Sequence, residues 1–406
     1  MVKTSERKSN MKKIMAVNAG SSSLKFQLLE MPEELVISEG IVERIGMEDS
    51  IYTIKVKGEK HRQVLPIQNH SLAVDLVLKD LINKGIIRDL SEISGIGNRI
   101  VHGGETYNES VLIDERAIEE ITKLCDLAPL HNPANLIGVK AFQKVLPNTK
   151  QVAVFDTAFH QTMAPEAYMY AIPYEWYTKY GIRKYGAHGT SHQYVGQEAA
   201  KMLGKPFEEC KIITLHLGNG ASLSAIKNGK CIDTSMGLTP LGGIPMGTRS
   251  GDIDPAIIEF IAKKENLSVS EIINALNKKS GYLGISGVSN DSRDLERCVE
   301  EGNKRCKLAL DLQYKRIADF VGSYYVYLGG VDAIVFTAGI GENSHQCREE
   351  IINRLAVLGL TIDKEANMTR GKRALITTVD SRVKAFVIPT NEELVIARDT
   401  LRLIGE

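Results

Sequence analysis

The chain has 406 residues, of which 43% are hydrophobic and 25% are charged, with 50 lysine and arginine residues against 50 aspartate and glutamate residues. At roughly 100 to 200 residues per domain, this length predicts two or three domains and makes an interdomain cleft available. The balanced charge argues against a nucleic-acid partner, because affinity for a phosphate backbone rests on an excess of lysine and arginine.

The cysteine spacing and the length of the apolar runs indicate which sites and which cellular location to expect. No cysteine lies in a C-x-x-C pair or at zinc-site spacing to a histidine, so we expect neither a disulfide framework nor a metal knuckle. No stretch approaches the roughly 20 apolar residues of a membrane helix, so we expect no membrane contact and a cytoplasmic location. Met11 with Lys12 and Lys13 resembles a second start, and residues 1–10 are therefore treated as an extension.

The first half of the chain opens with a predicted β-hairpin. Residues 14–30 read as an apolar strand, a small polar turn and an alternating strand. Helical periodicity follows at 72–82, 118–125 and 136–145, and QVAVF at 151–155 is typical of a buried strand. The alternation of helices and strands predicts an α/β protein with mixed sheets.

The second half repeats this plan. Residues 211–227 again read as a hairpin, and an Asn228-Gly229 turn leads to another short strand. Helices are predicted at 192–203, 255–262, 269–276, 347–355 and as one long stretch at 293–327, with strands at the start of 333–343 and at 385–389 and a last helix after Pro389. The chain is therefore expected to be internally duplicated, with its crossover near residue 157.

Three glycine-containing loops could face phosphates. In NAGSSSLK, residues 18–25, backbone N–H groups can face a phosphate that Lys25 neutralises, and a plain hairpin turn with a solvated lysine explains the loop about equally well. HLGNGAS, residues 216–222, is the matching loop of the second half, although such a loop by itself is more often only a turn. At 339–343 a Gly-x-Gly turn is predicted to end an apolar strand, at the sheet edge where ligands usually bind.

Nine motifs in one order resemble the acetate kinase family: VNAGSSSLK, RIVHGGE, VFDTAFHQTM, YGAHGTSH, HLGNGAS, DTSMGLTPLGG, GTRSGDIDP, FTAGIGEN and PTNEEL. The resemblance spans the chain from Met11 to Glu406. It implies the fold of the superfamily of acetate and sugar kinases, Hsp70 and actin: two similar, duplicated α/β domains of ribonuclease H type with mixed five-stranded sheets around a central nucleotide cleft. The implied domains are 1–157 with 393–406, for acyl and phosphate binding, and 158–392, for nucleotide binding.

The resemblance also implies the reaction, which is reversible in-line phosphoryl transfer from ATP to acetate, giving acetyl phosphate and ADP. Acetate is already an anion at neutral pH and needs no base, so the obstacle is its repulsion from the triphosphate. Cations should bring the two anions together, and arginine suits this because its guanidinium meets carboxylate or phosphate with two parallel donors. Mg²⁺ is the implied metal, with Mn²⁺ as an alternative, and the implied assembly is a homodimer.

Family correspondence assigns roles to individual residues. The implied catalytic residues are Arg99, Asp156, His188 and Arg249. The implied substrate-binding residues are Arg99, Val101, Leu130, His131 and Pro240, with Ala187 as a further wall of the acyl pocket. The implied metal ligands are Asn18 and Glu392. The implied nucleotide-binding residues are Lys25, His216, Leu217, Gly218, Asn219, Gly220, Asp291, Ser292, Arg293, Gly339, Ile340, Gly341, Glu342 and Asn343.

Several of these residues have simpler explanations. An arginine is more often part of an ion pair, Asp291 to Arg293 also reads as a helix cap, and Glu392 also reads as the acidic start of a helix beside the competing Glu393. For Asp156, holding an arginine or a magnesium-bound water suits the chemistry better than acid–base work, because acetate has no proton to give up.

The alternatives to an acetate kinase belong to three classes. Ala187 is smaller than the phenylalanine of some relatives, which leaves room for a longer acid and keeps a propionate or butyrate kinase open. A non-enzymatic ATP-gated switch of Hsp70 or actin type is a second class, and a plain two-domain binding protein is a third.

Overall fold

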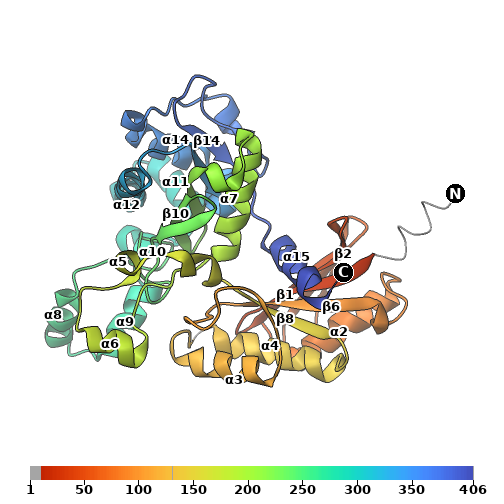
Figure 1. Cartoon of the computed structure of the whole chain (residues 1–406). Helices are drawn as coiled ribbons and strands as arrows, with labels where there is room; N and C mark the ends of the chain where they lie inside the picture. Colours follow the sequence, from red (N-terminus) through yellow and green to blue (C-terminus); the bar gives the residue numbers. More distant parts are fainter. Residues whose placement is uncertain (1–10, 130, 406) are drawn as a thin grey trace. The chain divides into compact units, whose positions relative to one another are not determined.

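The computed structural model describes residues 11–129 and 131–405 (Figure 1). Its contacts divide the chain into two compact units. One comprises the residues up to Ala158 together with those from Asn391 onward, and the other is Phe159–Thr390. None of the helices in the described ranges is long and apolar enough to cross a membrane.

The first unit is built on an eight-stranded sheet of order β5-β4-β3-β2-β1-β6-β8-β7. The strands are β1 (Lys12–Ala19), β2 (Ser23–Met31), β3 (Leu35–Glu43), β4 (Ile51–Val56), β5 (Glu59–Val64), β6 (Ile93–Ile100), β7 (Val111–Leu112) and β8 (Lys150–Phe155). Strands β1 and β2 form the predicted hairpin, with Asn18 opposite Lys25. Strands β6 and β8 extend the sheet in parallel to β1.

Among the described residues, the helices that cover this sheet are α2 (His70–Asn83), α3 (Glu115–Lys123), α4 (Asn132–Val145) and α15 (Glu392–Ile404). Helices α2 and α4 contain the segments predicted at 72–82 and 136–145, and α3 contains 118–123 of the segment predicted at 118–125. Side chains of Asn69, Asp114 and Asn391 cap α2, α3 and α15. Residues of α2 and α4, among them Val77 and Phe142, pack in one core with β1 and β2. Helix α15 packs against β6, β1 and β2.

The second unit is built on a six-stranded sheet of order β11-β10-β9-β12-β14-β13. The strands are β9 (Lys211–Leu217), β10 (Ala221–Lys227), β11 (Lys230–Thr234), β12 (Ala333–Thr337), β13 (Ala374–Leu375) and β14 (Lys384–Val387). The helices are α5 (Pro165–Tyr168), α6 (Tyr174–Tyr180), α7 (Gly189–Leu203), α8 (Ala256–Glu265), α9 (Val269–Lys278), α10 (Gly281–Ser286), α11 (Ser292–Glu300), α12 (Lys304–Leu328), α13 (Ala338–Asn343) and α14 (His345–Arg354).

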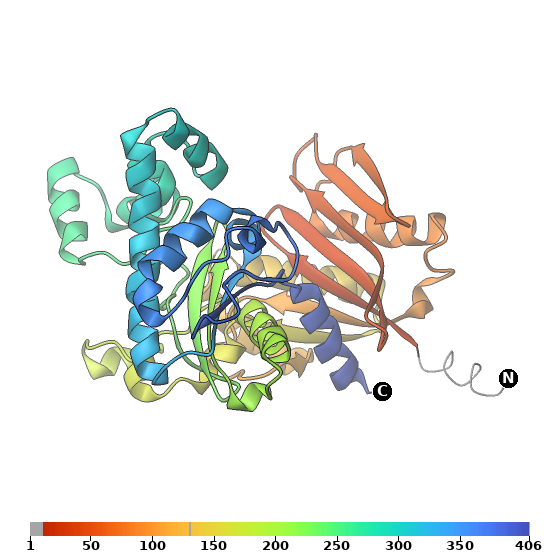
Figure 2. The ribbon, with the colours of Figure 1, turned by 90° about the horizontal axis from the view of Figure 1, so that it is seen from above.

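The two faces of β9 carry different chemistry because successive side chains of a strand point to opposite sides. Ile213 and Leu215 belong to the core that contains Ile317 and Val321 of α12. Thr214 and His216 instead bond residues of α7. Figure 2 shows the long α12 running beside this sheet. One face of β9 is thus an ordinary core, and the other is a buried polar layer.

The predicted duplication is confirmed. The orders β3-β2-β1-β6-β8 and β11-β10-β9-β12-β14 match, with an antiparallel three-stranded start and two strands parallel to the first strand. The expectation of five strands in each sheet is wrong, because β4, β5, β7 and β13 extend these cores to eight and six strands. Three of these four additions are hard to detect in the sequence, since β5 is mostly exposed and β7 and β13 have two residues each.

Two further predictions need correction. The single helix predicted at 293–327 is two helices, because Gly302 adopts a φ of 87° and Asn303 caps α12. The Gly-x-Gly turn predicted at 339–343 lies within α13, and Ala338, with a φ of 63°, makes the turn after β12. In the first case, apolar periodicity continues across Gly302 and hides the break between the helices. In the second case, Ala338 and not a glycine adopts the left-handed backbone conformation of the turn.

Candidate active site

A partly buried ion pair lies at the carboxyl ends of two neighbouring parallel strands of the first unit. Arg99 lies near the end of β6, and Asp156 follows β8 directly. The Arg99 Nε is 2.9 Å from Asp156 Oδ1 and its Nη2 is 2.6 Å from Oδ2, a bidentate arrangement. Burial opposes the charge of Arg99, but the carboxylates of Asp156 and Glu392 outweigh it and raise the pKa of Arg99. The guanidinium therefore stays charged.

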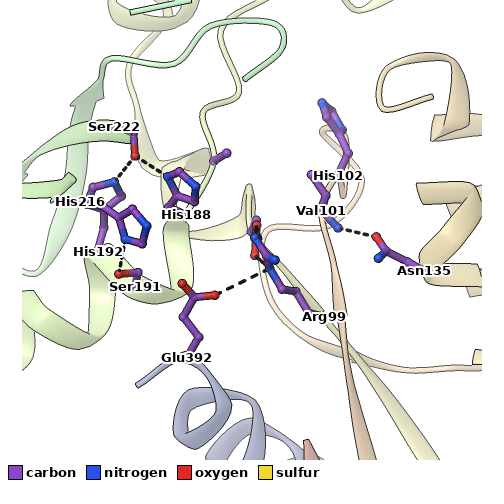
Figure 3. Close-up of polar contacts among 12 residues, drawn as sticks. Arg99, Val101, His102, Asn135, His188, Ser191, His192, His216, Ser222 and Glu392 are labelled. Carbon is purple, nitrogen blue, oxygen red and sulfur yellow. Dashed lines mark hydrogen bonds and ion pairs between the residues drawn. The ribbon is translucent and has the colours of Figure 1, made fainter. Parts of the chain in front are cut away.

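The first turn of α15 brings two glutamates to this place. The Oε2 of Glu392 lies 3.8 Å from Arg99 Nε (Figure 3), whereas Glu393 pairs with Lys25 of β2. Burial raises the pKa of Glu392, and the charge of Arg99 acts against this shift. The two adjacent glutamates are thus distinguished by their partners. Asn18, the other residue implied for the metal, lies opposite Lys25 in the β1–β2 pair.

Hard oxygen atoms are what Mg²⁺ requires, and Asn18 and Glu392 supply an amide and a carboxylate oxygen. Within 11–129 and 131–405, no group of three or more histidine, cysteine, aspartate or glutamate side chains could hold a metal. A metal here would therefore keep several waters or phosphate oxygens as ligands, which is the usual behaviour of Mg²⁺.

The loop after β6 is held by asparagines of α4 that the sequence analysis missed. Asn135 accepts from the backbone N–H of Val101 at 3.1 Å and donates to the carbonyl of Ala19 at 2.7 Å. Asn132 accepts from the N–H of His102 at 3.0 Å. These buried asparagines tie the Val101 loop to the first glycine-containing turn, and their three-residue spacing on one helix was the available signal. His131 precedes α4, and Leu130 lies outside the described residues.

Histidines cluster at the start of α7 in the second unit. His188 directly precedes α7 and has a left-handed φ of 61°. Its Nδ1 is hydrogen-bonded to Ser222 Oγ at 2.8 Å (Figure 3). Its ring stacks on that of His216 with 4.1 Å between centroids. His216 Nδ1 in turn lies 2.8 Å from Ser191 Oγ. The implied catalytic and nucleotide histidines are therefore brought together, and the serines are additions that the sequence analysis did not name.

Arg249 lies against Gly220, in the loop between β9 and β10. Its Nη1 donates to the carbonyl of Pro240 at 3.3 Å, and within the described parts of the chain it forms no ion pair. Burial lowers its pKa. A β-carbon placed at Gly220 would lie 3.2 Å from Arg249 Nη1 and 3.8 Å from His188 Cε1. The guanidinium and the imidazole thus converge on the backbone of Gly220, where a side chain would fill the space between them.

A pocket of about 510 Å³ opens next to this loop in the second unit. It is lined by eight of the implied nucleotide residues, Gly218, Asn219, Asp291, Ser292, Arg293, Gly339, Ile340 and Asn343, and by Asn290, Glu296, Ser344, Gln346 and Arg370, which the sequence analysis missed. Its walls come from the β9–β10 loop and from the starts of three helices, so only the fold assembles them. Asp291 also caps α11 and pairs with Arg293, so the cap interpretation holds as well.

Other implied nucleotide residues have structural tasks. The side chain of Leu217 lies in the hydrophobic core. Glu342 accepts at one carboxylate oxygen from the N–H groups of Ala338 at 2.8 Å and Thr390 at 3.1 Å, so it holds the turn after β12. Gly341 offers its carbonyl to the buried Arg348. These residues shape the wall of the pocket without lining it.

Comparison with known proteins gives one consistent result. Residues 13–398 match the model of the acetokinase family. Acetate kinases of Chlorante-Aster yellows phytoplasma and of Geobacillus sp. (strain WCH70) are 59% and 58% identical, over 96% and 97% of this chain and 95% and 99% of their own sequences. Among solved structures, an acetate kinase of Porphyromonas gingivalis has 44% identity and a TM-score of 0.93, and a propionate kinase of Francisella tularensis has 44% identity and a TM-score of 0.91. Each covers 97% of this chain and is itself covered completely.

Proposed function

Because the chain belongs to the acetokinase family, we propose that it transfers the γ-phosphoryl group of ATP reversibly to acetate, giving acetyl phosphate and ADP. The observation that carries this proposal is the loop 218–220. Gly218 and Asn219 line the 510 Å³ pocket, and Gly220 faces Arg249 and His188. If a nucleoside occupied the pocket, its phosphates would lie along the backbone of this loop and reach Arg249 and His188, which can donate hydrogen bonds.

The chemistry of the proposal needs cations more than it needs a base. Acetate and the γ-phosphoryl group repel each other, and catalysis consists mainly of positioning and of stabilising charge on the phosphoryl oxygens. Among the described residues, no carboxylate pairs with Arg249, so its N–H groups could bind an anionic substrate. Arg99 is oriented by Asp156, which supports the view that Asp156 positions a cation and does not act as a base.

The remaining assignments belong to the same proposal. Asn18 and Glu392 would hold Mg²⁺, or Mn²⁺ in its place, and the metal when bound would neutralise charge on the β- and γ-phosphates. The assignment of Val101, Leu130, His131, Ala187 and Pro240 to substrate binding remains a prediction, and Leu130 lies outside the described residues. The predicted domains are 1–157 with 393–406, and 158–392. These limits remain predictions, as do the nucleotide cleft, the cytoplasmic location and the homodimer.

The alternatives differ in their support. The acetokinase family consists of kinases, so a non-enzymatic switch and a plain binding protein are wrong for this chain. A propionate or butyrate kinase is the nearer competitor. Acetate is favoured because the relatives at 59% and 58% identity are named acetate kinase, whereas the propionate kinase structure is 44% identical.

We test the proposal by trapping acyl phosphate with hydroxylamine from ATP and Mg²⁺, with acetate, propionate and butyrate in parallel at matched concentrations. We expect acetyl hydroxamate in excess and propionyl hydroxamate as a slower product, since each added methylene changes the barrier by only ~1–3 kcal/mol. Reactions without ATP and reactions with Arg249→Ala serve as controls. A lead for propionate or butyrate would point to the small Ala187, and ATP binding without any hydroxamate would overturn the proposed function.

A further inference from the structure

We propose that Arg370 binds the base of the nucleotide by placing its planar guanidinium against the face of the base. Arg370 is one of the residues that line the 510 Å³ pocket, and the family resemblance assigns it no role. This role rests on the proposed function, because it assumes that the phosphates lie at the loop 218–220. All residues that define the position of Arg370 belong to the second unit.

The backbone on both sides of Arg370 is anchored to the helices that form the pocket. Arg348 Nη2 donates to the carbonyl of Thr369 at 2.8 Å, and Arg348, in α14, is itself 0% exposed. The N–H of Gly371 donates to the carbonyl of Glu342, in α13, at 3.1 Å. Arg370 therefore has a fixed place in the wall of the pocket.

The side chain of Arg370 is available to a ligand. Among the described residues, its guanidinium takes part in no hydrogen bond and no ion pair. The other arginine of the pocket, Arg293, instead pairs with Asp291 at 2.5 Å. Burial lowers the pKa of Arg348 to about 10, and the charge of Arg370 acts in the same direction, so these two cations repel each other. Arg370 thus lines the pocket as a cation without a carboxylate partner.

Helix α13 separates Arg370 from the loop that is proposed to hold the phosphates. A β-carbon at Gly218 would lie 3.7 Å from the Cβ of Ala338, the first residue of α13. A β-carbon at Gly371, next to Arg370, would lie 3.8 Å from Oδ1 of Asn343, the last residue of α13. The two ends of the helix are five helical rises apart, which is about 7.5 Å. Arg370 therefore lies toward the end of the pocket that is away from Gly218.

The chemistry of a nucleotide suits this arrangement. Its phosphates and its base are attached to opposite sides of the ribose, so phosphates at the loop 218–220 leave the base toward Asn343 and Arg370. A planar guanidinium stacks on the π-face of a base, and its positive charge favours this contact. Ile340, which also lines the pocket, adds an apolar side chain. Arg370 should therefore contribute to the binding of adenosine itself and not only of its phosphorylated forms.

Calorimetry on the full chain tests this role without acetate or turnover. The dissociation constant of ADP is measured directly, and that of adenosine is obtained from its competition with ADP. In Arg370→Ala, we expect both constants to rise by the same factor, about five- to twentyfold. Arg370→Lys should lose nearly as much affinity, because the ammonium keeps the charge but has no plane to stack. Lys372→Ala is the matched control, since it removes an exposed cation that does not line the pocket, and it should bind both ligands like the wild type.

Three results would overturn the role of Arg370. These are an unchanged affinity for ADP in Arg370→Ala, a loss of affinity for ADP while that for adenosine is kept, which would place the guanidinium on the phosphates, and full affinity in Arg370→Lys, which would reduce the contact to charge. The proposed function fails separately. A wild type that binds ADP and adenosine but forms no acetyl hydroxamate would overturn the kinase reaction and leave the result for Arg370 standing.

Discussion

Arg99 and Arg249 meet opposite electrostatic surroundings. Arg99 makes a bidentate pair with Asp156, which is 1% exposed, and also lies near Glu392. Arg249 bonds only a carbonyl and a thioether among the described residues, and burial lowers its pKa. A fixed arginine is suited to orienting an anion, and an arginine without a carboxylate partner is suited to receiving developing charge.

This difference makes Asp156→Asn informative. The amide keeps the size of the side chain but removes the charge that orients Arg99, and we expect kcat to fall about a hundredfold or more. ATP affinity measured by calorimetry should change little, because the pocket that we propose for the nucleoside is lined by residues of the second unit. Thermal unfolding serves as the control for folding. Near-normal turnover in this variant would exclude a role of Asp156 in the reaction.

At the scale of elements, α15 contributes to the first unit both its packing and two carboxylates that pair with Arg99 and Lys25. Its first turn carries Glu392 and Glu393, and its body packs closely against β6. The close approach depends on a glycine. A β-carbon at Gly97 would lie 2.3 Å from Thr400 Oγ1 and 2.4 Å from Ile396 Cγ2. The small residue on β6 therefore determines how near the helix and its glutamates lie to the sheet.

We expect Gly97→Ala to destabilise the protein by about 1–3 kcal/mol, because the added methyl group overpacks the contact between α15 and β6. Urea unfolding measures this change. Gly322→Ala is the matched control, since a β-carbon at this position in α12 meets nothing within 4 Å, and alanine favours a helix by roughly 0.5–1 kcal/mol over glycine. Equal midpoints for the two variants would show that the contact with α15 tolerates a side chain.

At the scale of the whole molecule, the second unit exposes large apolar side chains. Helix α6 carries Tyr174, Trp176 and Tyr180, and the end of α12 carries Val326 and Tyr327, all between 47% and 72% exposed. Tyr327 also lines a pocket shared with Ala167 and Tyr170, which precede α6. Figure 1 shows α5 and α6 near one another in this unit. Exposed apolar patches are typical of protein interfaces. We therefore predict that, in the expected homodimer, a second copy of the chain covers these side chains.

Light scattering after size exclusion tests this interface. The wild type should elute with about twice the 44.7 kDa of one chain. Val326→Glu should raise the dissociation constant about tenfold or more, because it would bury an unpaired carboxylate between the copies. Val379→Glu changes another valine, 85% exposed, and should leave the assembly unaltered. A monomeric wild type would contradict the dimer, and an unaffected Val326→Glu would contradict its location.

The sequence alone determined the duplicated α/β class, the two hairpins, most helices and the family. These depend on local information: periodicity, turn residues and motifs that stand in a fixed order along the chain. The end of α11 at Glu300 was missed because Gly302, with a positive φ, interrupts a helical pattern that continues on both sides. The turn after β12 was assigned to glycines, but Ala338 makes it with a positive φ. The edge strand β5 was missed because its exposed side chains show no alternation.

Only the tertiary structure decided which side chains meet. His192 and Thr214 are 22 positions apart, and they pair because α7 covers the face of β9 that points away from α12. Asn290 and Arg370 join one pocket wall although 80 residues separate them. No local pattern reports such pairings, since they depend on how the helices pack on the sheet. The sequence determined the elements and the chemistry that they carry, and packing decided which groups act on one another.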